Sequence, residues 1–174
     1  MIAAICCPGQ SLPAVWPPAD SHDLVFAVNS AAKLIPHDWL CAGDKSWFRG
    51  LLGDIQRPAL GILTSVDSIT DAREWMPFGP IIGWDAVPLI GEHARLGRPI
   101  NWSVQSAMCH AAHLGAKLVR LYGADGINST STIDASGYKG EDRTRDRWER
   151  EERDLAFTTE LLAGSGVTVE RIAL

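Results

Sequence analysis

Two aspartates stand at the ends of apolar segments, where their carboxylates could take part in acid–base or metal chemistry. Asp44 ends the segment 39–44, and Asp125 follows the segment 117–123. If both segments are parallel strands of one sheet, the two carboxylates meet at its carboxyl edge. Such a pair could hold Mg²⁺ together with substrate phosphates, or act as a base and its orienting partner. Capping of a following helix is the alternative role for Asp44.

A glycine loop follows the first apolar segment. Gly9, Gln10 and Ser11 come after residues 2–7. A glycine here would let backbone N–H groups approach a phosphate or a ribose closely, although any turn after a strand uses the same residue types.

The second apolar segment ends in a polar residue, Asn29, at the end of residues 24–29. Both a ligand contact and capping of the next helix are compatible with that position. Asn29 is therefore a second candidate for ligand binding.

A long polar segment follows Asp125. Residues 126–145 are rich in Ser, Thr, Gly and Asp, and their donors include Tyr138, Lys139 and Arg143. Polar loops of this length in a small domain are usually functional lids or disordered. We expect a lid whose cations, together with Arg145 and Arg147, close over a bound phosphate. From Arg147 onward, ion pairs with neighbouring glutamates are the alternative that the sequence favours.

Short apolar runs alternate with helix-like stretches along the chain, which is typical of parallel strands in an α/β fold. We expect a mostly parallel sheet of about six strands, with helices on both faces. The strands are predicted at residues 2–7, 24–29, 39–44, 59–64, 117–123 and 167–172, the last at an edge or antiparallel. The spacing also predicts a short helix at 69–75, irregular or short-stranded structure at 77–91, a buried helix at 103–114 and a surface helix at 145–162.

Seven of the aromatic residues are tryptophans. Four of them follow predicted strands or precede the predicted buried helix: Trp16, Trp47, Trp84 and Trp102. This distribution predicts a wall of indoles around the carboxyl edge, either stacking on a base or packing against a partner. Trp102 is the first candidate for stacking, whereas Trp39 is expected in the core. A Trp-rich surface would also suit a homo-oligomer.

Length, charge and composition exclude several classes of protein. The chain has 174 residues with 16 basic and 21 acidic side chains, a net charge of −5, and the size of one soluble domain. An acidic chain lacks the positive field that gathers nucleic acid or anionic lipid. No apolar run approaches the ~18 residues of a membrane span, and residues 1–7 are too few for a signal peptide. We therefore expect a cytoplasmic protein.

The cysteines and histidines give no strong metal signature. The four cysteines show no C-x-x-C spacing and read as reduced, buried thiols. His110 and His113 are three residues apart on the predicted buried helix and could be two metal ligands. The sequence favours structural roles for them, because no third ligand has a suitable spacing.

Five motifs occur in the order found in a known superfamily. They are residues 5–12 (Ile-Cys-Cys-Pro-Gly-Gln-Ser-Leu), 28–29 (Val-Asn), 39–44 (a strand ending in Asp), 103–117 (a helix leading to a strand) and 121–125 (Leu-Tyr-Gly-Ala-Asp). On these motifs the chain resembles the Rossmann-like superfamily of hydroxymethylpterin diphosphokinase-like proteins, motility-accessory glycosyltransferase-like proteins and bacterial sialyltransferases.

The resemblance implies one Rossmann-like domain over residues 1–174, a three-layer sandwich that binds a nucleotide or nucleotide-sugar. It implies a transferase for glycosyl or diphosphate groups, with Mg²⁺ as a candidate cofactor. The implied ligand contacts come from Gly9, Gln10, Ser11, Asn29, Ser103 at a helix N-terminus, Gly123 and Asp125. The sialyltransferases also use a general-base His beyond the last motif, and this sequence has no His after His113. A non-catalytic binding or assembly module is therefore the alternative function.

Overall fold

Seven parallel strands form the central sheet of the computed structural model, which describes residues 1–12, 21–51, 57–77, 79–125 and 144–172. All six strand pairs are parallel, and their order across the sheet is β5-β4-β3-β2-β1-β6-β7. The strands are β1 (Ile2–Cys6), β2 (Leu24–Val28), β3 (Trp39–Ala42), β4 (Gly61–Thr64), β5 (Ile81–Gly83), β6 (Leu118–Tyr122) and β7 (Thr168–Ile172).

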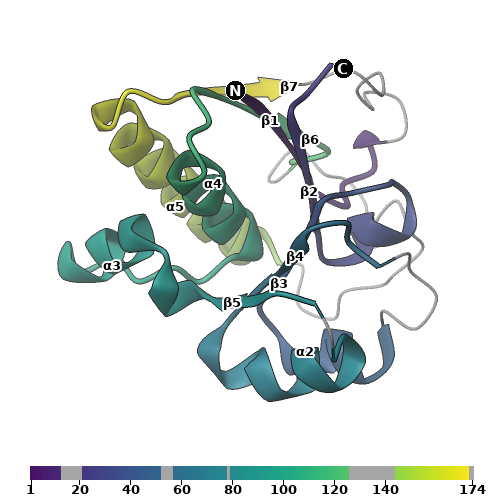
Figure 1. Cartoon of the computed structure of the whole chain (residues 1–174). Coiled ribbons are helices and arrows are strands. Elements are labelled where there is room, and N and C mark those ends of the chain that lie inside the picture. The colour runs from purple at the N-terminus through teal and green to yellow at the C-terminus, as the bar shows by residue number, and fades with distance from the viewer. Residues whose placement is uncertain (13–20, 52–56, 78, 126–143, 173–174) are drawn as a thin grey trace.

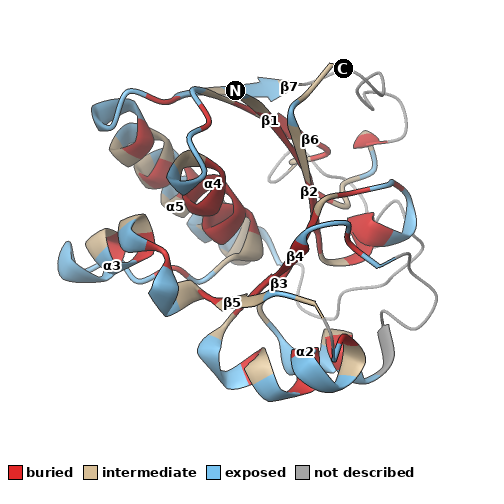
Figure 2. Ribbon diagram, in the orientation of Figure 1, coloured by how far each residue is buried: buried red, intermediate tan, exposed pale blue. Residues whose placement is uncertain are grey.

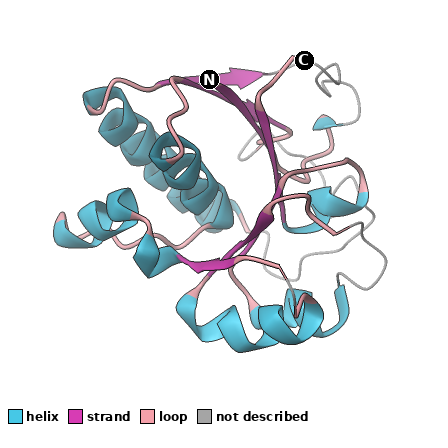
Figure 3. Ribbon diagram, in the orientation of Figure 1, coloured by secondary structure: helices cyan, strands magenta, loops and turns pink. Residues whose placement is uncertain are grey.

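Helices cover both faces of this sheet, so the molecule has three layers (Figures 1 and 3). One face carries α3 (Pro88–Arg95), α4 (Ser103–His113) and α5 (Arg145–Gly164). The other carries α2 (Ile69–Trp75) together with the 3-10 turn η1 (Asn29–Lys33) and the π-helical turn η2 (Trp47–Leu51). Two further 3-10 turns, η3 (Val66–Ser68) and η4 (Trp84–Ala86), follow β4 and β5. The fold class predicted from the sequence is confirmed.

The strand order reverses between β1 and β6. The chain places β1 to β5 side by side in one direction and then returns to place β6 on the opposite side of β1. In open parallel sheets such a reversal leaves a crevice outside the carboxyl ends of the strands, where ligands bind. In this chain Gly9 and Asp125 follow the two strands that flank it.

Two clusters of buried side chains hold the sheet between its helices, and Figure 2 shows the central strands coloured mainly as buried. Central strands are apolar throughout, because each successive side chain points to the opposite face and both faces are covered. In β1, Ile5 belongs to the layer beneath α4 and α5, whereas Cys6 belongs to the layer beneath η1 and α2. The edge strand β7 carries three polar residues among its five and has no buried residue.

The number of strands, residues 77–91 and the last strand were each predicted in part. The sheet has seven strands rather than about six, because the three-residue β5 is too short to show a periodicity. Residues 77–91 contain that strand and the start of α3, whose Pro88 stands at the favoured first helical position. The last strand, β7, is at an edge as expected, and it is parallel.

The prediction that the cysteines are reduced, buried thiols is confirmed. All four cysteines are buried free thiols. None of the helices in the described ranges combines the length and the apolar character that a membrane crossing requires. The predicted lid falls almost wholly on residues 126–143, which lie outside the described residues, while Thr144 caps α5 and Arg145 is its first residue.

His110 packs inside the α4 layer as a structural residue. It is 1% exposed, its ring meets Trp39 edge-on at 4.6 Å between centroids, and Phe26 lies 6.1 Å away. Neither of its ring nitrogens has a hydrogen-bond partner among the described residues. No cluster of three metal-ligating side chains occurs in those residues either, which agrees with the structural role.

We expect His110 to make stability depend on pH. Burial, with a smaller contribution from His113, lowers the pKa of His110 to about 4, whereas the unfolded side chain titrates near 6.5. As the pH falls, the unfolded chain therefore takes up the proton before the folded one does. The stabilising contribution of neutral, buried His110 is complete above about pH 6.5. Below that pH, the free energy of unfolding falls by up to about 1.4 kcal/mol per pH unit. Urea unfolding at pH 7 and 4.5 should show a smaller loss in His110→Leu than in the wild type; an equal loss in both would contradict the assignment.

Candidate functional site

A cleft of about 1030 Å³ lies at the carboxyl ends of the strands. This volume is near the upper end of the ~300–1000 Å³ typical of small-molecule sites. It brings together seven of the predicted site residues: Gly9, Asn29, Asp44, Trp102, Ser103, Gly123 and Asp125. Gln10 and Ser11 are not among its lining residues, and Tyr138, Lys139 and Arg143 lie outside the described residues.

The glycine loop packs backbone to backbone against the end of β6. The Gly9 N–H donates to the Gly123 carbonyl at 2.9 Å, one step beyond the bond from the Cys7 N–H to the Tyr122 carbonyl at 2.8 Å. A Cβ on Gly9 would lie 2.1 Å from the Gly123 carbonyl oxygen, and one on Gly123 would lie 2.3 Å from the Cys7 carbonyl oxygen. Both glycines are required by this close approach, which brings the two loops together on one side of the cleft.

Asp125 holds the glycine loop in place. Its carboxylate accepts a hydrogen bond from the Ser11 N–H at 3.0 Å and another from the Ser11 hydroxyl. Hydrogen bonds to a charged acceptor are the stronger ones in proteins, typically about 1.5–3 kcal/mol each. Ser11 is thus placed by Asp125, and Asp125 is a positioning residue in this structure.

Ser103 connects α4 to two strand ends. Its hydroxyl accepts from the Gly43 N–H at 3.0 Å and donates to the Asn29 side-chain oxygen at 3.4 Å. Asn29 has a φ of 50°, a left-handed conformation that costs a non-glycine residue about 1 kcal/mol or more. The cleft thus contains a strained residue at the end of β2, held against the first turn of α4.

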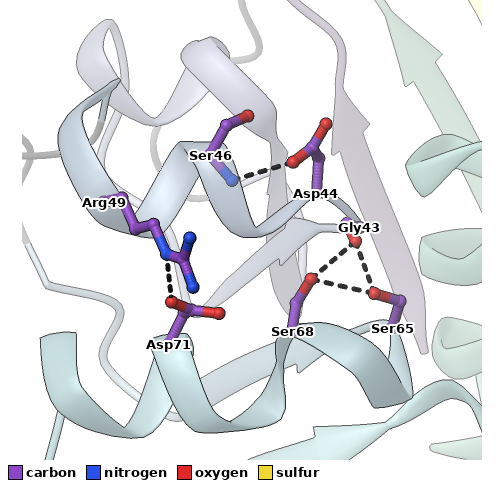
Figure 4. A network of polar contacts seen from close by, with 7 residues as sticks. All are labelled: Gly43, Asp44, Ser46, Arg49, Ser65, Ser68 and Asp71. Atoms are coloured by element: carbon purple, nitrogen blue, oxygen red, sulfur yellow. Dashed lines mark hydrogen bonds and ion pairs between the residues drawn. The ribbon is translucent and has the colours of Figure 1, made fainter.

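The end of β3 is fixed to the element that follows β4 (Figure 4). The Ser65 and Ser68 hydroxyls both donate to the Gly43 carbonyl, and the two hydroxyl oxygens lie 3.0 Å apart. Next to them, Asp44 is exposed, and one of its oxygens accepts from the Ser46 N–H at 2.8 Å. Asp44 therefore caps the following turn, the alternative that the sequence left open, and it also lines the cleft.

Tryptophans line the cleft, as the sequence predicted. The lining includes Trp47, Trp84, Trp102 and Trp148, whereas Trp39 lies in the core and Trp16 falls outside the described residues. Trp84 packs directly on Gly43, where a Cβ would come within 2.6 Å of its ring. Its indole N–H is buried and has no acceptor among the described residues.

Trp102 and Arg147 form a stacked pair at the junction of α4 and α5. The Trp102 indole N–H donates to the Asp154 carboxylate at 2.9 Å, which fixes the ring. The Arg147 guanidinium lies over that ring, 5.2 Å from its centroid. The sequence favoured an ion pair between Arg147 and a neighbouring glutamate; among the described residues, the structure places the Arg147 guanidinium on the indole of Trp102.

The charges of the cleft are mixed. Arg171 binds Glu152 through two hydrogen bonds of 2.8 Å and also donates to the Ala124 carbonyl. Burial, reinforced by Glu151, raises the pKa of the Cys7 thiol well above its usual range, so this thiol lines the cleft in its neutral form. No histidine occurs among the described residues of the lining.

Solved structures of a sialyltransferase share the fold of this chain. The complex of sialyltransferase CST-II with a trisaccharide acceptor and CMP matches with a TM-score of 0.58 at 14% identity, over 98% of this chain and 80% of the enzyme chain. A variant of CST-II in complex with CMP matches with a TM-score of 0.61 at 13% identity, over 97% and 80% of the two chains. Another variant of this α-2,3/8-sialyltransferase gives a TM-score of 0.60 at 12% identity, over 98% and 81%.

No family model matches the chain, and no curated protein matches its sequence. At 12–14% identity the structural match shows a common fold. The resemblance to hydroxymethylpterin diphosphokinase-like proteins stays a prediction. The resemblance to sialyltransferases predicted an α/β fold for this chain. That fold is confirmed, because the chain shares it with the CST-II structures.

Proposed function

We propose that the protein binds a nucleotide or a nucleotide-sugar in the cleft at the carboxyl edge of its sheet and acts as a glycosyltransferase-like enzyme. The observation that carries the proposal is the convergence of the glycine loop, Asn29 and Ser103 on one cleft at the reversal of strand order. The CST-II structures, which contain CMP, support a cytidine nucleotide as the first ligand to test.

The described residues suggest a division of roles within the cleft. Gly9 sets the close packing of the glycine loop on the end of β6, since its N–H donates to the Gly123 carbonyl, and Ser103 opens α4, whose N-terminal N–H groups favour an anion. Glycosyl transfer also needs a base that takes the proton of the acceptor hydroxyl. Asp125 is occupied by Ser11, so Asp44, exposed on the cleft wall, is our candidate for that base.

A ligand panel tests the binding proposal. Thermal unfolding would be followed with CMP, CDP, UDP and ATP, each with and without Mg²⁺. At a concentration 100 times its Kd, a ligand that binds only the folded protein stabilises it by about 2.7 kcal/mol. We expect CMP or CDP to raise Tm, and a dependence on Mg²⁺ would identify a metal-assisted complex. No shift with any of these nucleotides would contradict the proposal.

A non-catalytic binding module is the second candidate function. It is favoured by the occupied carboxylate of Asp125 and by the lack of a histidine among the described lining residues. Incubation with CMP-sialic acid distinguishes the two, because an enzyme releases CMP and loses this activity in Asp44→Asn. Binding without release in the wild type supports the module, and light scattering then tests self-association through the Trp-rich cleft wall.

A further inference from the structure

Arg147 carries a buried donor that the described residues do not satisfy. The residue lies in the first turn of α5 and lines the cleft. Among the described residues its Nε–H has no hydrogen-bond partner, and its guanidinium forms no ion pair. This N–H differs from the unpaired ring nitrogens of the core, such as those of His110, because it belongs to a residue of the cleft wall, where a ligand can supply the acceptor.

The protein holds this guanidinium in one position before any ligand arrives. The face of Trp102 supports it, and the indole is itself fixed by Asp154 through the 2.9 Å hydrogen bond. The Arg147 main chain is anchored too, because its N–H donates to the Thr144 hydroxyl at 3.3 Å. A side chain held in this way loses little rotational freedom when it binds.

Three carboxylates close to Arg147 in the sequence or in the cleft are used by other cations and donors. Glu149 pairs with Arg145 at 3.0 Å, and Glu152 is bound by Arg171. Asp125 accepts its bonds from Ser11. Arg147 therefore lies on the cleft wall, and none of these three carboxylates neutralises its charge.

A second unpaired donor lies in the same cleft. The Trp84 indole N–H is buried without an acceptor among the described residues, and its ring packs on Gly43 close to Ser103. Two buried donors without acceptors on the walls of one cleft indicate a ligand that brings acceptor oxygens. A guanidinium favours oxygens that carry negative charge and accept two hydrogen bonds.

We propose that Arg147 recognises an oxyanion of the bound ligand and so determines the specificity of the cleft for anionic ligands. This inference rests on the proposed function and deepens it. The oxyanion is either the phosphate of a nucleotide or the carboxylate of an acidic sugar, which present the same paired oxygens to the guanidinium.

Isothermal titration of the whole chain with three probes tests the inference: CMP, cytidine and free N-acetylneuraminic acid. Wild type would be compared with Arg147→Gln, which removes the charge, and with Arg153→Gln, an exposed arginine of the same helix that does not line the cleft. We expect Arg147→Gln to weaken the binding of CMP or of the acidic sugar at least about tenfold, as expected for a lost charge-assisted hydrogen bond, and to leave cytidine binding within twofold. Arg153→Gln should bind all three as the wild type does.

The pattern of losses identifies the oxyanion. A loss for CMP without one for cytidine assigns the phosphate, and a loss for N-acetylneuraminic acid assigns the carboxylate. Unchanged binding of both anions by folded Arg147→Gln overturns the inference and leaves the proposed function standing. If wild type binds none of the probes, the cytidine-nucleotide form of the proposed function fails, and this inference fails with it. Arg147→Lys, which keeps the charge and loses the planar donor pair, provides a second variant if Arg147→Gln unfolds.

Discussion

Gly123→Ala should destabilise the fold by at least about 3 kcal/mol, or prevent folding, because an added Cβ has no room. It would lie 2.3 Å from the Cys7 carbonyl oxygen and 2.7 Å from the Leu12 Cβ, both in the loop at the end of β1. Neither neighbour is the end of a flexible side chain, so the β1 and β6 loops must separate. The free energy of unfolding, measured in urea, gives the loss directly.

Gly166→Ala is the matched control for this prediction. Gly166 has a φ of 75°, close to the 64° of Gly123, and an added Cβ there meets no atom within 4 Å. It should cost only the backbone strain of a left-handed alanine, about 1–2 kcal/mol. Equal losses in the two variants would mean that the close approach of the two loops is not what Gly123 provides.

Asp125→Ala has the second largest expected effect. It removes the acceptor of both hydrogen bonds from Ser11 and leaves the Ser11 N–H without its partner, so we expect a loss of about 2–3 kcal/mol in the free energy of unfolding. Because Asp125 also sets the position of the glycine loop, nucleotide binding should weaken by more than tenfold. Urea unfolding and titration with CMP measure the two effects.

Two further variants test whether the loss in Asp125→Ala comes from its contact with Ser11 or from a general loss of stability. In Asp44→Ala the lost bond is a single exposed one to the Ser46 N–H, so unfolding should change by about 1 kcal/mol or less. Ser11→Ala in the Asp125→Ala background should add little, since the two side chains act as one contact. Fully additive losses in the double variant would refute the assignment of Asp125 to Ser11.

The central strands, and the meeting of several candidate residues in one cleft, could be predicted from the sequence because both depend on strong local signals. Apolar runs such as residues 2–7 and 39–44 specify strands that are buried on both faces. Polar residues after such strands must meet at one edge of a parallel sheet, and the structure brings Gly9, Asp44 and Asp125 to one cleft. The three-residue β5 has too few residues to give a pattern of its own.

Contacts between distant segments were beyond sequence reasoning. Asp125 was predicted to act on a ligand or a metal, and its partner in the structure is Ser11, 114 residues away. Arg147 was assigned to local ion pairs with glutamates, whereas it lies on Trp102 of another helix. Residue types and spacing do not show whether a charged side chain contacts a sequence neighbour or a distant residue, because either partner can interact with its charge.

The tryptophans offer the most direct test of the central claim that the cleft is the ligand site. In a heteronuclear NMR titration with CMP, each indole N–H gives its own signal. Trp47, Trp84 and Trp102 line the cleft, whereas Trp39 lies in the core and Trp75 packs against Phe48 beneath the opposite face. We predict that the indole signals of the three cleft tryptophans move with a common Kd and those of Trp39 and Trp75 do not. Movement confined to Trp39 or Trp75, or binding of CMP with no change at the cleft tryptophans, would contradict the account.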